Sequence, residues 1–108
     1  MKKIELIKGP FAPKERIEYA VGSVVSQQLT YNPAGNLTLF AFDEGQQLSE
    51  HTAPFDAICQ ILDGTAEIHV GGEIYEVGAG QMLIMPANVP HALYAKKAFK
   101  MLLIMIKG

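Results

Sequence analysis

The spacing of short apolar runs is the feature of this sequence that most restricts its fold. These runs recur every eight to twelve residues, each is followed by glycine, proline, asparagine or aspartate, and no stretch keeps helical spacing. Such runs are typical of β-strands joined by turns. The predicted strands are Ser23–Tyr31, Leu37–Asp43, Ala57–Leu62, Thr65–Val70, Glu73–Val77, Met82–Met85, His91–Ala95 and Phe99–Ile106. Many short strands with glycine-rich turns predict an all-β sandwich or barrel.

The chain is long enough for one domain. Of its 108 residues, 49% are hydrophobic and 19% are charged, which excludes intrinsic disorder. The net charge of −2 gives no general attraction to nucleic acid or to an anionic membrane, so neither is an expected partner. We expect residues 1–16 to form an N-terminal arm or edge strand and residues 17–108 to form a single barrel domain. Phe11, between Pro10 and Pro13, favours an arm that docks.

Charge is divided unevenly along the sequence. Residues 43–76 carry eight acidic side chains and no basic one, whereas residues 77–108 carry four basic side chains and no acidic one. One interpretation is that acidic central strands pair with basic terminal segments. The other is an acidic rim around an opening built by the central strands, which would disfavour anionic ligands.

The single cysteine, Cys59, rules out an internal disulfide and a cysteine zinc cluster. The first residues, Met1 to Glu5, have no apolar signal core, and the longest apolar run, Met101 to Ile106, is only six residues long. These observations predict a soluble protein that stays in a reducing cytoplasm.

Two histidines lie in segments with a recognisable pattern. The first segment resembles the first cupin motif, which reads glycine, five residues, His-x-His, three or four residues, Glu, six residues, glycine. The second resembles the second cupin motif, which reads glycine, five residues, Pro-x-Gly, two residues, His, three residues, Asn. The matching positions are Gly45, His51, Gly64, Gly80, Pro86 and His91. The resemblance implies a small single-domain cupin with a double-stranded β-helix, that is, a jelly-roll barrel.

The resemblance also identifies a candidate metal centre that has lost half of its ligands. In the family, three histidines and one glutamate hold the metal, and these positions fall here on His51, Ala53, Ala57 and His91. Two imidazoles without a carboxylate do not suit iron or manganese, so we expect no tightly bound catalytic metal. Zinc, nickel or copper at low occupancy is left open. Cys59, two residues beyond Ala57 on the same strand face, is either a third ligand or a small buried hydrophobe.

The resemblance places His51, His91, Ala53, Ala57 and Cys59 in one barrel pocket, because these positions face the interior. The predicted function is binding of a small polar molecule in this pocket. The alternative is a metal-dependent cupin enzyme, such as an oxygenase or isomerase, with a reduced ligand set. A third hypothesis is a protein whose role is contact with a partner.

Low charge and abundant apolar residues also predict a homodimer. The outward-facing residues Ile58, Gln60 and Leu62 are candidates for the contact, together with the strand 101–106. Asp56, after Pro54 and Phe55, is expected to hydrogen-bond a turn amide.

Glu67 and His69 alternate with the apolar residues of their strand. They are expected to form its outward polar face, and no chemistry is assigned to His69.

Overall fold

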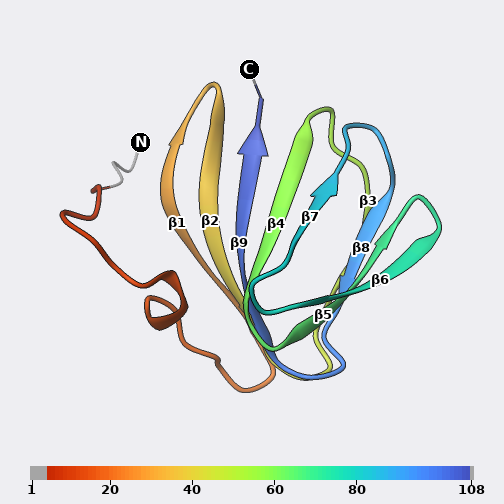
Figure 1. The fold of residues 1–108 in the computed structure, drawn as a ribbon, viewed down its shortest axis with the longest axis horizontal. Helices are drawn as coiled ribbons and strands as arrows, with labels where there is room; N and C mark the ends of the chain where they lie inside the picture. Colours follow the sequence, from red (N-terminus) through yellow and green to blue (C-terminus); the bar gives the residue numbers. More distant parts are fainter. Residues whose placement is uncertain (1–4, 108) are drawn as a thin grey trace.

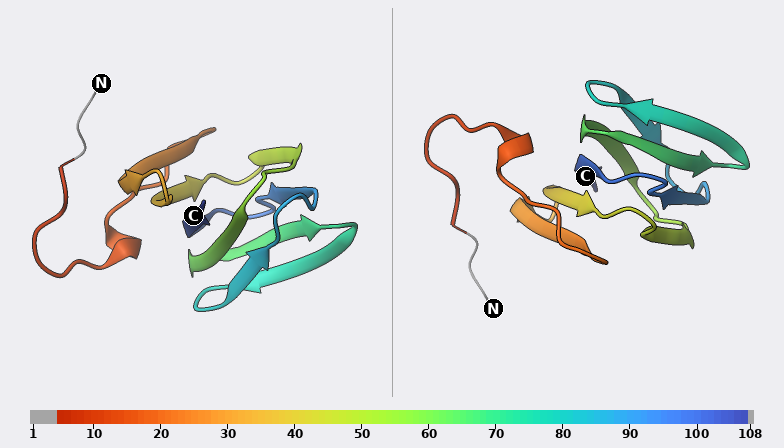
Figure 2. Two further views of the ribbon diagram at one scale, coloured as in Figure 1. Left: turned by 90° about the horizontal axis from the view of Figure 1, so that it is seen from above. Right: turned by 90° about the horizontal axis from the view of Figure 1, so that it is seen from below.

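Alternation of apolar and polar residues gives each of two antiparallel sheets a buried face, and these faces pack together (Figure 1, Figure 2). This computed structural model describes residues 5–107. One sheet has five strands in the order β1-β2-β9-β4-β7, and the other has four in the order β3-β8-β5-β6. The strands are β1 (Val24–Asn32), β2 (Gly35–Phe42), β3 (Gln47–His51), β4 (Asp56–Asp63), β5 (Thr65–Val70), β6 (Glu73–Gly78), β7 (Met82–Met85), β8 (His91–Tyr94) and β9 (Phe99–Ile106). No helix in this range is long and apolar enough to cross a membrane.

The prediction of an all-β jelly-roll barrel is confirmed. Strands β5, β7 and β9 have the predicted bounds, and the other predicted strands differ by no more than two residues at either end. Strand β3 was not predicted, because all five of its residues are exposed and lack the alternation that marks a half-buried strand. It forms through its pairing with β8.

The barrel interior is packed by side chains from both sheets. The inward residues of β4, namely Ala57, Cys59 and Ile61, are at most 3% exposed. Phe42 and Phe99 stack with their ring centroids 4.6 Å apart and their planes 13° from parallel. The interior is therefore a continuous apolar core along most of its length.

One end of the barrel, which we call the closed end, comprises residues 61–65, 78–81 and 95–100. Backbone hydrogen bonds tie its loops together: the Gly80 N–H donates to the Ile61 carbonyl at 2.8 Å, and the Ala79 N–H donates to the Gly64 carbonyl at 3.1 Å. Gly64 has a φ of +74°, and a Cβ there would collide with the Ala98 carbonyl oxygen. The β4–β5 turn and the β8–β9 loop are thus in direct contact.

The N-terminal arm lies beside β1 (Figure 1), and its apolar side chains pack on the outer face of the five-stranded sheet. Its described part has one short 3-10 helix, η1 (Pro13–Glu15), and no strand; residues 1–4 lie outside the described residues. Ile17 is 4% exposed and packs with Leu39 and Ala41 of β2. Phe11 stays 41% exposed, so the docking is carried mainly by Ile17 rather than by Phe11.

Polar contacts hold the arm at the closed end. The Tyr19 hydroxyl donates to an Asp63 carboxylate oxygen at 2.6 Å, and the Lys14 ammonium lies 3.5 Å from the other oxygen. Lys100, only 7% exposed, donates to the Lys14 carbonyl at 2.8 Å. The Tyr19 hydrogen bond, aided by Lys14, holds the pKa of Asp63 below its usual value. Pairing of the acidic centre with a basic terminal segment is therefore favoured over an acidic rim.

Candidate functional site

Strands β3 and β8 bring His51 and His91 together at the end of the barrel opposite the closed end. The two residues are cross-strand partners, and their ring centroids are 4.3 Å apart with an interplanar angle of 71°. We call this region, residues 51–56 and 86–91, the histidine end. The predicted convergence of two imidazoles forty positions apart is present in the fold.

Hydrogen bonds to the backbone fix which nitrogen of each ring carries the proton. Nδ1 of His51 lies 2.8 Å from the Ser49 carbonyl oxygen, and Nδ1 of His91 lies 3.2 Å from the Val89 carbonyl oxygen. Because a carbonyl oxygen only accepts, each Nδ1 is the donor, and each neutral ring keeps a lone pair on Nε2. Among residues 5–107, neither Nε2 has a hydrogen-bond partner.

The two rings differ in exposure. His51 is exposed, whereas His91 is 5% exposed beneath it. Burial lowers the pKa of His91, and the neighbouring His51 lowers it further, while the hydrogen bond to Val89 opposes both effects. His91 is therefore neutral at pH 7, and its Nε2 is an acceptor.

The two alanines at the family's ligand positions have different surroundings. Ala57 is 3% exposed and belongs to the packed core, where Met85 and Met105 are its cross-strand partners. Ala53 is half-buried, and its carbonyl accepts from the Asn88 N–H at 2.8 Å. Asn88 has a φ of +63°, which asparagine tolerates at a tight turn. Ala57 is therefore part of the packed core, with a methionine beside it on each neighbouring strand.

Cys59 lies deeper in the interior than the histidines. It is fully buried, its Sγ lies 3.3 Å from the Met101 Sδ, and burial raises the pKa of its thiol to about 12. No group of three or more His, Cys, Asp or Glu side chains within residues 5–107 is arranged to hold a metal ion. The structure thus does not assemble a site from His51, His91 and Cys59, and Cys59 fits the alternative of a small buried hydrophobe.

Asp56 and His69 take the positions expected from the sequence. The Ala87 N–H donates to the Asp56 carboxylate at 2.9 Å, so Asp56 braces the loop that precedes His91. His69 lies on the outer face of β5, with its Nε2 2.8 Å from a Glu67 carboxylate oxygen.

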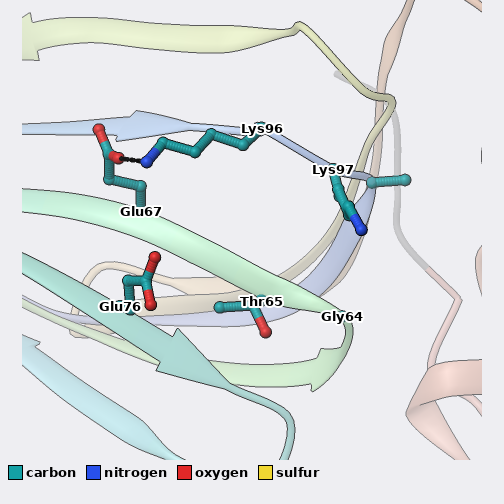
Figure 3. A pocket seen from close by; sticks show the side chains of 7 residues that line it. Gly64, Thr65, Glu67, Glu76, Lys96 and Lys97 are labelled. Carbon is teal, nitrogen blue, oxygen red and sulfur yellow. Dashed lines mark ion pairs between the residues drawn. The ribbon is translucent and has the colours of Figure 1, made fainter.

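Sequence reasoning missed a pocket on the outer face of the four-stranded sheet (Figure 3). It has a volume of about 360 Å³ and is formed by Gly64, Thr65, Glu67, Glu76, Lys96, Lys97 and Ala98. The available signal was the outward polar row of Thr65, Glu67 and His69 at alternate positions of β5. Only the fold brings β5 and β6 against the loop at residues 95–98.

Comparison with known proteins agrees with this architecture. The family model described as cupin domain matches residues 38–107. A conserved protein of unknown function from Streptococcus pyogenes is 36% identical, with a TM-score of 0.90 over 100% of this chain and 96% of that chain. A cupin superfamily protein from Desulfitobacterium hafniense is 28% identical, with a TM-score of 0.88 over 99% of this chain and 97% of that chain.

A longer protein also aligns with this chain. A cupin 2 conserved barrel domain protein from Leptotrichia buccalis is 39% identical, with a TM-score of 0.83 over 86% of this chain and 45% of that chain. No curated protein sequence matches significantly. Because the family model spans more than half of the sequence and the fold agrees along its whole length, this chain belongs to the cupin family.

Proposed function

We propose that this protein binds a small polar molecule at the histidine end, through the Nε2 atoms of His51 and His91. The observation that carries this proposal is the pair of lone pairs left by the two Nδ1 hydrogen bonds to backbone carbonyls. Adjacent acceptors with no protein donor suit a ligand that donates two hydrogen bonds, such as a diol or an amino alcohol. Exposed His51 provides the route of approach, since Ala57 lies in the packed core.

The donor set argues against a tightly bound catalytic metal. Alanine occupies two of the four family ligand positions, and the thiol of Cys59 contacts Met101 instead of the histidines. Two neutral imidazoles suit weak binding of zinc, nickel or copper, but they do not satisfy iron or manganese. The same lone pairs are what favour the second candidate, a metal-dependent cupin enzyme with a reduced ligand set.

Metal analysis of protein purified without a histidine tag separates the two candidates. We expect substoichiometric metal in the wild type. Stoichiometric zinc, nickel, copper or iron that is lost in the double variant His51→Ala/His91→Ala would contradict the first candidate and support the enzyme.

Ligand binding is tested by thermal shift against a panel of sugars and amino alcohols. We expect a stabilising compound whose effect disappears in His51→Ala and His91→Ala. His69→Ala is the matched control, because it removes the third imidazole from the outer face and should keep the effect. A stabilisation that survives both site substitutions would place the ligand elsewhere.

We further propose that the chain is a homodimer that pairs through the outer face of β9, β4 and β7. Part of the predicted contact is corrected by burial: Met101 and Leu103 face the interior, and Leu62 and Leu102 pack against the arm. What stays outward is an apolar row in which Ile58 pairs with Ile84 on one side and Ile104 on the other.

The apolar row is continued by exposed neighbours. Ile84 is 60% exposed, Met82 is 55% exposed and Ile106 is 52% exposed. A contiguous exposed apolar surface of this kind favours self-association, and a second copy of the chain presents the same row.

Sedimentation of the wild type and of two matched variants tests the dimer. We expect a dimer at micromolar concentration that Ile84→Glu dissociates. Ile74→Glu is the control, because Ile74 is 63% exposed on β6, away from the apolar row. A monomeric wild type, or dissociation by both substitutions, would overturn the proposed face.

We also propose a cytoplasmic location. The only cysteine is free and buried, and the chain has no internal disulfide to be maintained by an oxidising compartment. Cell fractionation with a specific antibody tests this, and recovery in a secreted or membrane fraction would contradict it.

A further inference from the structure

The outer pocket is built where strands β5 and β6 meet the loop before β9. Figure 3 shows the carboxylates of Glu67 and Glu76 on one side of it, Lys97 on the other, and Thr65 between them. This pocket lies on the opposite face of the four-stranded sheet from the buried core, and it shares no residue with the histidine end.

Glu67 is already neutralised by protein groups. One of its carboxylate oxygens lies 2.8 Å from the Lys96 ammonium, and the other lies 2.8 Å from the His69 Nε2. The hydrogen bond to Lys96, and then that to His69, holds the pKa of Glu67 below its usual value, and Glu67 raises the pKa of Lys96. The side chain of Glu67 is 18% exposed, so its position is well defined.

Glu76 and Lys97 are the two charges of the pocket that make no hydrogen bond in this network, although the charge of Glu76 also helps to raise the pKa of Lys96. Glu76 is the cross-strand partner of Glu67, which sets two like charges side by side, and the Lys96 ammonium offsets part of their repulsion. Among residues 5–107, neither Glu76 nor Lys97 makes a hydrogen bond or an ion pair. The pocket therefore presents one unpaired carboxylate and one unpaired ammonium at separate positions.

The pocket wall at Gly64 and Ala98 is held in place by close backbone contacts. Gly64 contacts the Ala98 carbonyl so closely that only glycine fits, and the Ala79 N–H bonds the Gly64 carbonyl. The wall of the pocket is thus part of the closed end and needs little ordering when a ligand binds.

We propose that this pocket binds a small zwitterion, whose ammonium group lies against Glu76 and whose carboxylate faces Lys97. A simple cation would be repelled by Lys96 and Lys97, and a simple anion by the two carboxylates, whereas a molecule with both charges satisfies both unpaired groups. A pocket of about 360 Å³ is in the range of small-molecule sites. Binding is reversible and involves no covalent step.

Amide chemical shifts of the full chain provide the test. The probes are glycine, 4-aminobutanoate and 6-aminohexanoate, which carry the same two charges at increasing separation. Butylammonium and butanoate are the single-charge controls. We expect saturable shifts at Gly64, Thr65 and Ala98 with at least one zwitterion, and binding at least about tenfold weaker for both single-charge probes.

Four single variants and one double variant complete the experiment. Glu76→Gln and Lys97→Gln should each weaken binding by at least about threefold. Glu73→Gln and Lys8→Gln, exposed charges outside the pocket, are the matched controls and should bind as the wild type does.

The results that would overturn the proposal are distinct from failure at the histidine end. No saturable shift at these amides with any zwitterion, equal binding of butylammonium, or unchanged affinity in Glu76→Gln and Lys97→Gln would each overturn it. His51→Ala/His91→Ala should keep the zwitterion shifts, so the outer pocket is tested even if the histidine end binds nothing.

Discussion

The closed end and the histidine end are built from the same two sheets but differ in how their polar groups are used. At the closed end, loops are joined by backbone hydrogen bonds, Phe42 and Phe99 stack, and the arm is held at Asp63. At the histidine end, two imidazoles from β3 and β8 meet with both Nε2 atoms unpaired within the described chain. Loop-to-loop hydrogen bonds and the contacts of the arm gather at one end, whereas the other end keeps polar atoms available for a ligand.

The difference also separates the two proposed ligand sites. The histidine end offers the imidazole of His91 as a neutral acceptor, because burial lowers its pKa. The outer pocket at the closed end offers fixed charges, of which Glu67 and Lys96 are already paired with each other. Donor-rich neutral molecules are therefore expected at one end and zwitterions at the other.

The largest expected effect is a cavity at the closed end. Ile61 is fully buried, and Ile61→Ala should lower the free energy of unfolding by about 2–5 kcal/mol. His51→Ala, at an exposed position, should change it by less than about 0.5 kcal/mol. Urea unfolding with equal m-values provides the measurement, and similar losses for both variants would contradict the contrast between the ends.

A substitution at Gly64 should have the next largest effect. Gly64→Ala adds a Cβ that collides with the Ala98 carbonyl and strains a positive φ, so we expect a loss of at least about 2 kcal/mol. Gly45→Ala is the matched control, because its φ of +86° is similar but a Cβ there meets nothing within 4 Å. The control should lose only about 1 kcal/mol, and equal losses would mean that the β4–β5 turn does not depend on close contact with the loop.

Removing the hydroxyl of Tyr19 should loosen the arm. Tyr19→Phe deletes the hydrogen bond to Asp63 and should cost about 1 kcal/mol of stability. Because the folded pKa of Asp63 is lowered, its stabilising contribution is fully present above the unfolded value of about 4 and is lost as pH falls through the folded value.

Stability measured between pH 2 and pH 7 should therefore fall less steeply in acid for Asp63→Asn than for the wild type. An unchanged acid slope would show that the arm is held by apolar packing alone.

The smallest expected effect is the titration of His91. Its pKa should lie below the usual value of about 6.5, because burial disfavours the imidazolium. The unfolded chain then binds more protons between the two values, so stability should decrease as pH falls from about 6.5 to the folded pKa and then level off.

NMR titration of the histidine ring resonances measures this directly. In His51→Ala the pKa of His91 should move upward, because the neighbouring charge and part of the burial are removed. A His91 midpoint at or above 6.5 in the wild type would contradict the inferred burial.

Much of the fold and half of the candidate site could be predicted from sequence. Alternation gave the strands that have one buried face, and the spacing of the two motifs gave the meeting of His51 and His91. Strand β3 was missed because its residues are all exposed and do not alternate between apolar and polar. It is held in an extended conformation by its pairing with β8. Whether Cys59 is a metal ligand or a buried hydrophobe could not be predicted, because its contact with Met101 is not local. Met101 follows Cys59 by 42 residues and reaches it only through the pairing of β4 with β9.

By itself, the sequence determined the class of fold through local periodicity, and its resemblance to the cupin motifs implied that two histidines meet and that two of the family's ligand positions hold alanine. Only the tertiary structure decided that Ala57 lies in packed core, that an arm is fastened at Asp63, and that Glu76 and Lys97 share a pocket. The reason is physical: burial and charge pairing depend on which distant segments come into contact. The sequence of a single strand does not specify which other segments pack beside it.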